Sequence, residues 1–392
     1  MNDKFFLVLS PSEWSDNAVS NMQISAILSK NNDVVYVETI GTRIPKFSEW
    51  RRVISRLYNS LFKSKKKGQR KGLNPINVKI VSPLALPYHN NSIVNKINVF
   101  LINKQLKNFI PKNKKIYVWS FSPIWENFIN TIPNKFRIFH CVDALHTYDD
   151  SDNYKNLFYK SLKESNIVFT PGILLAKELK QHNRKTYIIG HGCGSKHLES
   201  KNSNQIPEDI KNFQLTKKTV VYAGTLANWV DYDLLNYLAS SNDEITFLII
   251  GYIHPLAPID KIKEFLKHKN VIHLGYKNYD DLPLYYAISS LGIIPYQSQN
   301  EHIQYSTPTK FFDYFSSGLQ TVSTDFPAAH AYDKEFVKVA KSKEEFLEMI
   351  ENALIDLDMD RSIEIKEYAK KNSWENQVKK MCEIIDQVEN DS

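Results

Sequence analysis

The sequence of 392 residues lacks the features that mark several classes of protein. Its cysteines are only three, Cys141, Cys193 and Cys382, and they lie far apart, which argues against a disulfide framework and against a zinc cluster. Its longest apolar runs, such as 5–9 and 247–250, fall far short of the roughly 20 residues that a membrane-spanning helix needs. No signal-peptide pattern opens the chain. We therefore expect a cytosolic protein with reduced thiols.

The glycine motif of dinucleotide-dependent enzymes is also missing. Neither half of the chain has Gly-x-Gly-x-x-Gly after its first expected strand, and the segment LSPSEWSDN that follows the first of these strands has no glycine at all. This argues against a dinucleotide-dependent dehydrogenase. We find no Asp-x-Asp or histidine cluster that demands a metal, and we expect no metal and no cofactor.

The net charge of +7 comes from one segment. Residues 51–71 contain nine basic residues and no acidic one; without them, 41 basic residues face 43 acidic ones. A nucleic-acid-binding protein would more often spread basic residues over a face and interleave aromatic residues, so this class is not favoured.

The same segment carries apolar residues at helical spacing: Trp50, Val53, Ile54, Leu57, Tyr58, Leu61 and Phe62. An amphipathic basic helix with a polybasic tail is typical of a segment that lies on an anionic membrane surface. Alternatively, the apolar residues pack on a sheet and the lysines form a solvated loop. The first reading predicts that Arg51 to Lys71 bind a membrane surface.

Short apolar runs alternate with helical patterns along the whole chain. We expect strands at 5–10, 33–38, 78–81, 115–120, 137–141, 167–170, 187–189, 219–223, 246–251, 271–275, 291–295, 320–324 and 336–339. Helical spacing between them, for example over 17–30, 92–108 and 153–164, indicates α/β architecture with parallel, buried strands. Ligands in such sheets bind beyond the carboxyl ends of the strands.

The polar segment 196–218, rich in Asn, Ser and Lys, reads as a linker between two Rossmann-like domains. We expect domains over 1–195 and 219–372, with a cleft between them that would hold the ligand. The final helical pattern over 373–388 has apolar residues on one face, which should dock on another part of the protein.

The segment STPTKFFDYFSSGLQTVSTD, residues 306–325, is expected to form a helix and then a strand. Pro308 suits the first turn of a helix and Gly318 its end. Lys310 in the first turn is unfavourable unless an anion binds there, and a diphosphate would resolve the conflict. Asp313 is placed to accept hydrogen bonds from the hydroxyls of a ribose. Alternatively, Lys310 and Asp313 form an ordinary surface pair.

This segment resembles the donor-site segment of GT-B glycosyltransferases, in which Pro-x-Lys-x-x-Glu-Tyr-x-x-x-Gly precedes a strand. Three further segments, VVYAGTLANWVDYDLL, VIHLGYKNYDDLPLYYAISSLGIIPY and FRIFHCVDALHTYDD, resemble other parts of that fold in the same order. The chain is most similar to bacterial enzymes of the retaining family 4 type that build teichuronic acids, capsules and O-antigens. The resemblance implies two Rossmann-like domains, with the final helix, 373–392, crossing back to the first.

The resemblance also implies a donor site in the second domain. Gly224 and Thr225 would lie near the phosphates, and Ser306, Thr307 and Lys310 would hold the diphosphate. Asp313 would bind the ribose, while Tyr276 and Tyr279 would flank the base, although each tyrosine alone reads equally as core or rim. The chain departs from the family in having Asp313 where Glu is usual and Tyr305 where the first Glu of the related Glu-x7-Glu motif is expected. These donor-site residues are Gly224, Thr225, Tyr276, Tyr279, Ser306, Thr307, Lys310 and Asp313.

The first domain would supply the acceptor side and the chemistry. His140 and Asp143 follow a buried strand and are candidates for proton transfer or for binding a sugar hydroxyl; alternatively, His140 is structural. Trp14 and His191 are candidates for the acceptor side; alternatively, Trp14 is a packed aromatic residue. If the reaction retains configuration, a donor phosphate oxygen takes the acceptor's proton and Lys310 stabilises the leaving diphosphate.

These readings predict a peripherally membrane-associated glycosyltransferase that moves a sugar from a nucleotide diphosphate to a bacterial surface glycan or lipid-linked glycan, with the nucleotide sugar as substrate. One alternative is a GT-B epimerase or phosphorylase. Another is a catalytically weak subunit that binds a partner enzyme, a reading that the missing first Glu supports.

Overall fold

The computed structural model describes residues 1–15, 19–40, 77–86, 92–145, 151–199, 206–211, 213 and 218–391. The basic segment 51–71, for which we predict membrane binding, lies outside these residues. The chain forms two compact units. Unit 1 comprises Met1–Pro171, Leu175–Ile189 and Val378–Ser392, and unit 2 comprises Gly172–Leu174 and Gly190–Gln377. The domain limits predicted from the sequence stay a prediction.

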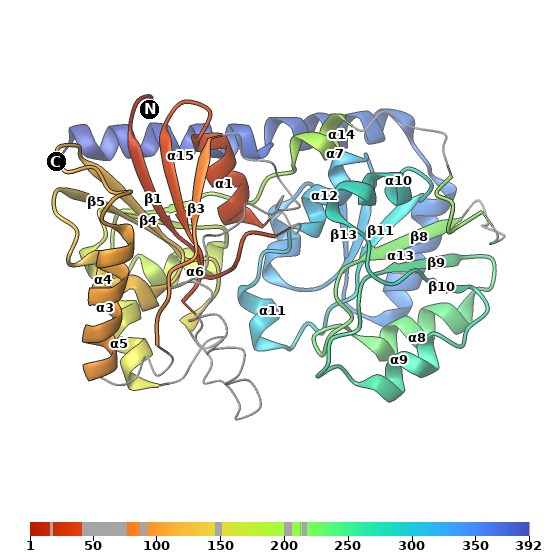
Figure 1. The fold of residues 1–392 in the computed structure, drawn as a ribbon. Coiled ribbons are helices and arrows are strands. Elements are labelled where there is room, and N and C mark those ends of the chain that lie inside the picture. The colour runs from red at the N-terminus through yellow and green to blue at the C-terminus, as the bar shows by residue number, and fades with distance from the viewer. Residues whose placement is uncertain are drawn as a thin grey trace. The chain divides into compact units, whose positions relative to one another are not determined.

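Unit 1 contains a parallel sheet with the strand order β3-β2-β1-β4-β5-β6-β7 (Figure 1). Its strand β1 is apolar and fully buried, as expected for a parallel sheet covered on both faces. The strands are β1 (Phe5–Leu9), β2 (Asp33–Val37), β3 (Val78–Val81), β4 (Ile116–Ser120), β5 (Lys135–His140), β6 (Ile167–Thr170) and β7 (Thr186–Ile188). The helices between them are α1 (Ser20–Leu28), α3 (Ser92–Leu106), η2 (Pro123–Trp125), α4 (Glu126–Ile129), α5 (Asp152–Glu164) and α6 (Ile173–Leu179).

Unit 2 contains a second parallel sheet, with the order β10-β9-β8-β11-β12-β13. Its strands are β8 (Thr219–Ala223), β9 (Thr246–Ile250), β10 (Val271–His273), β11 (Leu291–Ile294), β12 (Thr321–Thr324) and β13 (Val337–Ala340). Its helices are α7 (Ser195–Glu199), α8 (Tyr232–Ser241), α9 (Ile259–Phe265), η4 (Tyr279–Asp281), α10 (Leu282–Tyr286), α11 (Glu301–Tyr305), α12 (Lys310–Ser316), η5 (Pro327–Ala331), α13 (Lys343–Ile355) and α14 (Met359–Lys371).

Each sheet has a point where the strand order reverses. In unit 1 the chain places β2 and β4 on opposite sides of β1, and in unit 2 it places β9 and β11 on opposite sides of β8. Open α/β sheets bind ligands just beyond the carboxyl ends of the strands at this point. The fold class predicted from the alternating pattern, two Rossmann-like α/β domains, is confirmed. In unit 2, a ligand site is expected at the carboxyl end of β8.

The last helix, α15 (Trp374–Asn390), belongs to both units, because its residues from Val378 onward group with unit 1. Its side chains Val378, Met381, Ile385 and Val388 are buried, which confirms the predicted docking face. Near its end, Glu389 accepts hydrogen bonds from the Lys115 ammonium at 2.5 Å and from the Tyr117 hydroxyl at 2.6 Å. Both partners belong to β4 or the residue before it.

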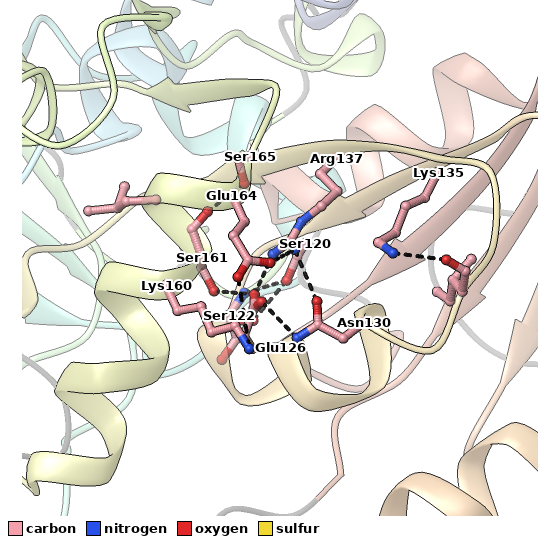
Figure 2. A network of polar contacts seen from close by, with 12 residues as sticks. Ser120, Ser122, Glu126, Asn130, Lys135, Arg137, Lys160, Ser161, Glu164 and Ser165 are labelled. Atoms are coloured by element: carbon pink, nitrogen blue, oxygen red, sulfur yellow. Dashed lines mark hydrogen bonds and ion pairs between the residues drawn. The ribbon is translucent and has the colours of Figure 1, made fainter.

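A buried polar network ties three elements of unit 1 together (Figure 2). The Arg137 guanidinium on β5 lies 2.6 Å from the Glu126 carboxylate on α4 and also pairs with Glu164 at the end of α5. Ser161 donates to the same Glu126 oxygen at 2.9 Å. Because Arg137 and Glu126 are both buried, each charge depends on the other for compensation.

Candidate functional site

Three neighbouring strands of unit 2 end at glycines on the edge where a ligand is expected. The Gly224 N–H, just after β8, donates to the Ile250 carbonyl at 2.7 Å, and the Gly251 N–H donates to the Gly275 carbonyl at 2.8 Å. Gly251 has a φ of +147°, and a Cβ there would collide with the Gly224 carbonyl. The glycines therefore let these strand ends pack closely against each other and against the Lys310 side chain.

Helix α12 places a cation, the Lys310 ammonium, at this edge. Lys310 is its first residue, and the far end of its side chain lies against Gly224. The ammonium also lies 5.7 Å from the ring centroids of both Tyr222 and Tyr296. Lys310 forms no salt bridge with any residue that the structure describes, so the alternative of a Lys310–Asp313 surface pair is wrong. A half-buried ammonium held by two tyrosine rings has its charge available for an anion.

Helix α12 ends where the sequence predicted, but it begins later than predicted. Leu319 N–H donates to the Tyr314 carbonyl at 3.1 Å and Gly318 N–H to the Phe315 carbonyl at 2.9 Å, with Gly318 at φ +76°. This pair of bonds is a Schellman motif and confirms Gly318 as the helix end. Pro308, however, precedes the N-cap residue, Thr309, so its predicted place in the first turn is wrong. The Thr309 carbonyl, which accepts from both Phe312 and Asp313, sets where the helix begins.

Asp313 is buried beneath this edge, with 5% of its surface exposed. The Tyr279 hydroxyl donates to Asp313 Oδ1 at 2.7 Å, so two of the predicted donor-site residues are in direct contact. Burial raises the pKa of Asp313 above its ordinary value, although His197, the Tyr279 hydrogen bond and Lys310 all oppose the rise. Burial also raises the pKa of Tyr279. Among the described residues, the second carboxylate oxygen of Asp313 accepts no hydrogen bond, so it can accept one from a further donor.

His197 on α7 completes the cluster and was not anticipated from the sequence. Its ring stacks on Tyr279 at 4.1 Å between centroids, and Nε2 lies 2.8 Å from the Tyr279 carbonyl. Since a carbonyl oxygen only accepts, Nε2 carries the proton. Nδ1 lies 3.9 Å from Asp313 Oδ1 and is buried with no hydrogen-bond partner among the described residues. Nothing in the local sequence distinguishes His197 from the ten other histidines.

A second histidine of unit 2, His191, packs against the loop before α12. Its ring hydrogen-bonds to the Thr307 backbone and meets Trp374 edge-on at 6.0 Å. Burial lowers the pKa of His191 to about 4, which the bond to Thr307 partly opposes. His191 is therefore neutral at physiological pH and suited to hydrogen bonding.

The remaining donor-site candidates of unit 2 line the same region. The Thr225 carbonyl accepts from the Tyr222 hydroxyl at 3.0 Å, which connects the turn after β8 to a ring beside Lys310. Ser306 N–H donates to the Ile303 carbonyl at 3.2 Å and ends α11. Tyr276 is exposed.

The candidates of unit 1 lie in or beside its core. His140 is buried at the end of β5, with its ring stacked on Phe121 at 4.9 Å between centroids. Asp143 is half-buried, and its backbone carbonyl accepts from the Cys141 thiol at 3.3 Å. Trp14 is buried and packs edge-on against Tyr36 at 4.9 Å.

Trp14 is therefore a packed aromatic residue of the core, and little of its surface is exposed for the predicted role on the acceptor side. His140 and Asp143 both follow the carboxyl end of β5, as predicted from the sequence.

The described residues contain no group of three or more His, Cys, Asp or Glu side chains that could hold a metal ion. None of the described helices is long and apolar enough to cross a membrane. The candidate site in unit 2 consists instead of a backbone edge, one lysine and one buried carboxylate with its two aromatic partners.

Comparison with known proteins agrees with this arrangement. The family "Glycosyl transferases group 1" matches residues 203–372, which include the glycine edge and α12. A protein of Bacillus subtilis (strain 168) named as the teichuronic acid biosynthesis glycosyltransferase TuaH is 26% identical over 162 residues. That match spans 41% of this chain and 40% of the relative.

Solved structures match over nearly the whole chain. A glycosyltransferase from Rickettsia africae ESF-5 has a TM-score of 0.69 at 13% identity and covers 100% of both chains. Anabaena Alr3699/HepE in complex with UDP and glucose has a TM-score of 0.68 at 12% identity, over 98% of this chain and 100% of that one. WaaG, a glycosyltransferase involved in lipopolysaccharide biosynthesis, has a TM-score of 0.61 at 14% identity, over 97% and 99%. The chain thus shares the fold of these solved glycosyltransferases, and its residues 203–372 match the family of glycosyl transferases group 1.

Proposed function

We propose that this protein transfers a sugar from a nucleotide diphosphate donor to a glycan or lipid-linked glycan of the bacterial surface. The observation that carries the proposal is the position of Lys310 over Gly224, at the carboxyl end of β8. An ammonium that forms no salt bridge among the described residues, placed at the glycine that follows β8, matches the charge of a diphosphate.

The other residues of unit 2 fit a donor in the same orientation. With the diphosphate beside Lys310, Ser306 and Thr307 lie on the loop that leads into α12, and Asp313 lies one turn further along the helix. The free Asp313 oxygen would accept a hydrogen bond from a ribose hydroxyl, while exposed Tyr276 and the ring of Tyr279 would flank the base.

In the transfer step, the bond between the anomeric carbon and the diphosphate oxygen breaks, and a bond to the acceptor oxygen forms. Negative charge develops on the departing diphosphate, which Lys310 would stabilise. We propose retention of configuration, with the acceptor's proton passing to a donor phosphate oxygen. His140 and Asp143 would bind or orient the acceptor, with His191, neutral at physiological pH, as a hydrogen-bonding group.

The names of the relatives support the substrate classes. HepE was solved with UDP and with UDP-glucose, and the Bacillus relative is named for teichuronic acid, a cell-surface polymer. We therefore propose a nucleotide sugar as the donor and a surface glycan as the acceptor, with no metal or cofactor in the transfer step.

The test is a thermal-shift screen of the full chain against UDP, GDP, CDP, ADP and their common sugar conjugates, followed by donor hydrolysis. A ligand that binds only the folded protein raises its stability by mass action. We expect a shift with one nucleotide family, and we expect Asp313→Ala to remove it while exposed Asp243→Ala keeps it. If no nucleotide shifts the melting temperature and no donor is hydrolysed, the proposal fails in favour of a catalytically weak subunit that binds a partner enzyme.

A further inference from the structure

Helix α3 of unit 1 has apolar residues on two opposite sides. Ile102 and Leu106 are buried and belong to a core cluster of unit 1. Ile93, Ile97 and Phe100 are instead 69%, 41% and 65% exposed. At 3.6 residues per turn these three side chains lie in one stripe, on the side of the helix away from Ile102 and Leu106. A surface helix normally shows a polar outer side, so this stripe needs an explanation.

The exposed lysines of α3 and of the residue after it lie on the same outer side. By helical spacing, Lys96, Lys104 and Lys107 flank or overlie the apolar stripe. In the described part of the chain, none of these three lysines forms a salt bridge. The outer face of α3, meaning these three lysines with Ile93, Ile97 and Phe100, thus combines exposed apolar surface with uncompensated positive charge.

The charge of this face continues through the surrounding sequence. Residues 50–125 contain 16 basic residues and no acidic one, and the rest of the chain contains 34 basic and 43 acidic residues. Among the described residues of this stretch, Lys114 pairs with Asp33 at 3.7 Å and Lys115 pairs with Glu389 at 2.5 Å. Charge of one sign is therefore concentrated in the part of the sequence that contains α3, which favours an anionic partner.

Apolar side chains and lysines on one helix face match a lipid surface better than other anionic partners. The aliphatic and phenyl groups would enter the boundary between headgroups and acyl chains, while the lysine stems extend along it and their ammonium groups reach the headgroups. A nucleic acid would be expected to use aromatic residues for stacking, and only one of the three exposed apolar residues is aromatic.

We propose that the outer face of α3 binds the surface of an anionic lipid bilayer. Figure 1 shows α3 at the edge of unit 1, beside α4 and with no other described helix of the unit outside it. The proposal goes beyond the transfer reaction, since this face would bind lipid whether or not the chain transfers a sugar. It is also separate from the segment 51–71, which carries its own predicted membrane contact.

The test is co-sedimentation of the full chain with vesicles of phosphatidylglycerol and phosphatidylcholine, and with vesicles of phosphatidylcholine alone. We expect the wild type to bind only the anionic vesicles, and less at high salt. Ile97→Asp together with Phe100→Asp should lower the partition coefficient at least about tenfold, since it removes two inserting groups and adds two negative charges. Lys104→Gln with Lys107→Gln leaves every apolar side chain in place and should weaken binding by a smaller factor.

The matched control is Leu256→Asp with Met359→Asp, which changes two exposed apolar residues of unit 2 and should leave vesicle binding unchanged. Melting temperatures and nucleotide binding of all variants should match the wild type, which separates this test from that of the proposed function. Unchanged partition of either α3 variant would overturn the proposal, as would equal binding of the wild type to both vesicle types. A change of oligomeric state with unchanged vesicle binding would assign the face to a protein partner and overturn it as well.

Discussion

Lys310 lies over Gly224 so closely that a Cβ at position 224 would collide with its Cε and, at 2.5 Å, with its ammonium nitrogen. The two residues are far apart in sequence, and each is needed for the same feature. Gly224 leaves the space, and Lys310 fills it with a positive charge held between Tyr222 and Tyr296. The role of Lys310 can therefore be tested by replacing either residue.

Lys310→Ala should lower turnover about 100-fold to 1,000-fold with little change in melting temperature, because it removes one group that stabilises the leaving diphosphate. Gly224→Ala should lower turnover too, because the added methyl displaces the lysine. If both act through Lys310, the double variant will be no slower than Lys310→Ala alone. Gly190→Ala is the control, since a Cβ there meets nothing within 4 Å. Additive losses in steady-state kinetics would show that Gly224 acts independently of Lys310.

Asp313→Asn should change the pH dependence of stability. A carboxyl whose pKa is raised in the folded state binds its proton more tightly there, so it stabilises the fold below its unfolded pKa and loses this effect as the pH rises through the folded pKa. Burial raises the pKa of Asp313. The melting temperature of Asp313→Asn minus that of the wild type should therefore increase as the pH rises from about 4 to 7. Asp243→Asn, at an exposed position, should run parallel to the wild type; a flat difference for Asp313→Asn as well would mean that its charge is fully compensated.

His197→Phe should weaken donor binding about tenfold. The phenyl ring keeps the stacking on Tyr279 but loses the bond to the Tyr279 carbonyl and the nitrogen that faces Asp313. The expected change is in the dissociation constant of the nucleotide, measured by calorimetry, with a smaller change in the rate at saturating donor. His182→Phe, which alters a histidine packed on Tyr159 at 4.8 Å in unit 1, should leave nucleotide affinity as it is. Equal affinity in both variants would remove His197 from the donor site.

The sequence predicted the strands well because the strands are locally encoded. The run Thr219–Ala223 is apolar and β-branched, and the structure has β8 over the same residues. Gly318 ended its helix as expected, since a residue with positive φ is required there. The order of the strands in each sheet was not predicted, because periodicity carries no information about which strands become neighbours.

The parts of the site that escaped prediction depend on contacts distant in sequence. His197 and Tyr279 are 82 positions apart, and Tyr279 and Asp313 are 34 apart. Spacing along a helix indicates which side chains share a face, but it does not indicate that a histidine from α7 will stack on a tyrosine from η4. The burial of Asp313 has the same origin: its neighbours come from three separate elements, so a charge that reads as exposed in the sequence becomes buried in the fold.

Arg137→Met should destabilise unit 1 by about 3–5 kcal/mol, because it leaves the Glu126 carboxylate buried without its cation. Adding Glu126→Gln should recover most of that loss, since the amide oxygen still accepts from Ser161 and no charge remains to be compensated. Lys160→Met is the control: its pair with Glu164 at 3.9 Å is exposed at both ends and should contribute only about 0–1 kcal/mol. Urea titrations followed by circular dichroism measure all three free energies of unfolding. If the double variant is no more stable than Arg137→Met, the loss of stability in Arg137→Met does not come from the uncompensated Glu126 charge. It then comes from the packing of Arg137 and from its other contacts.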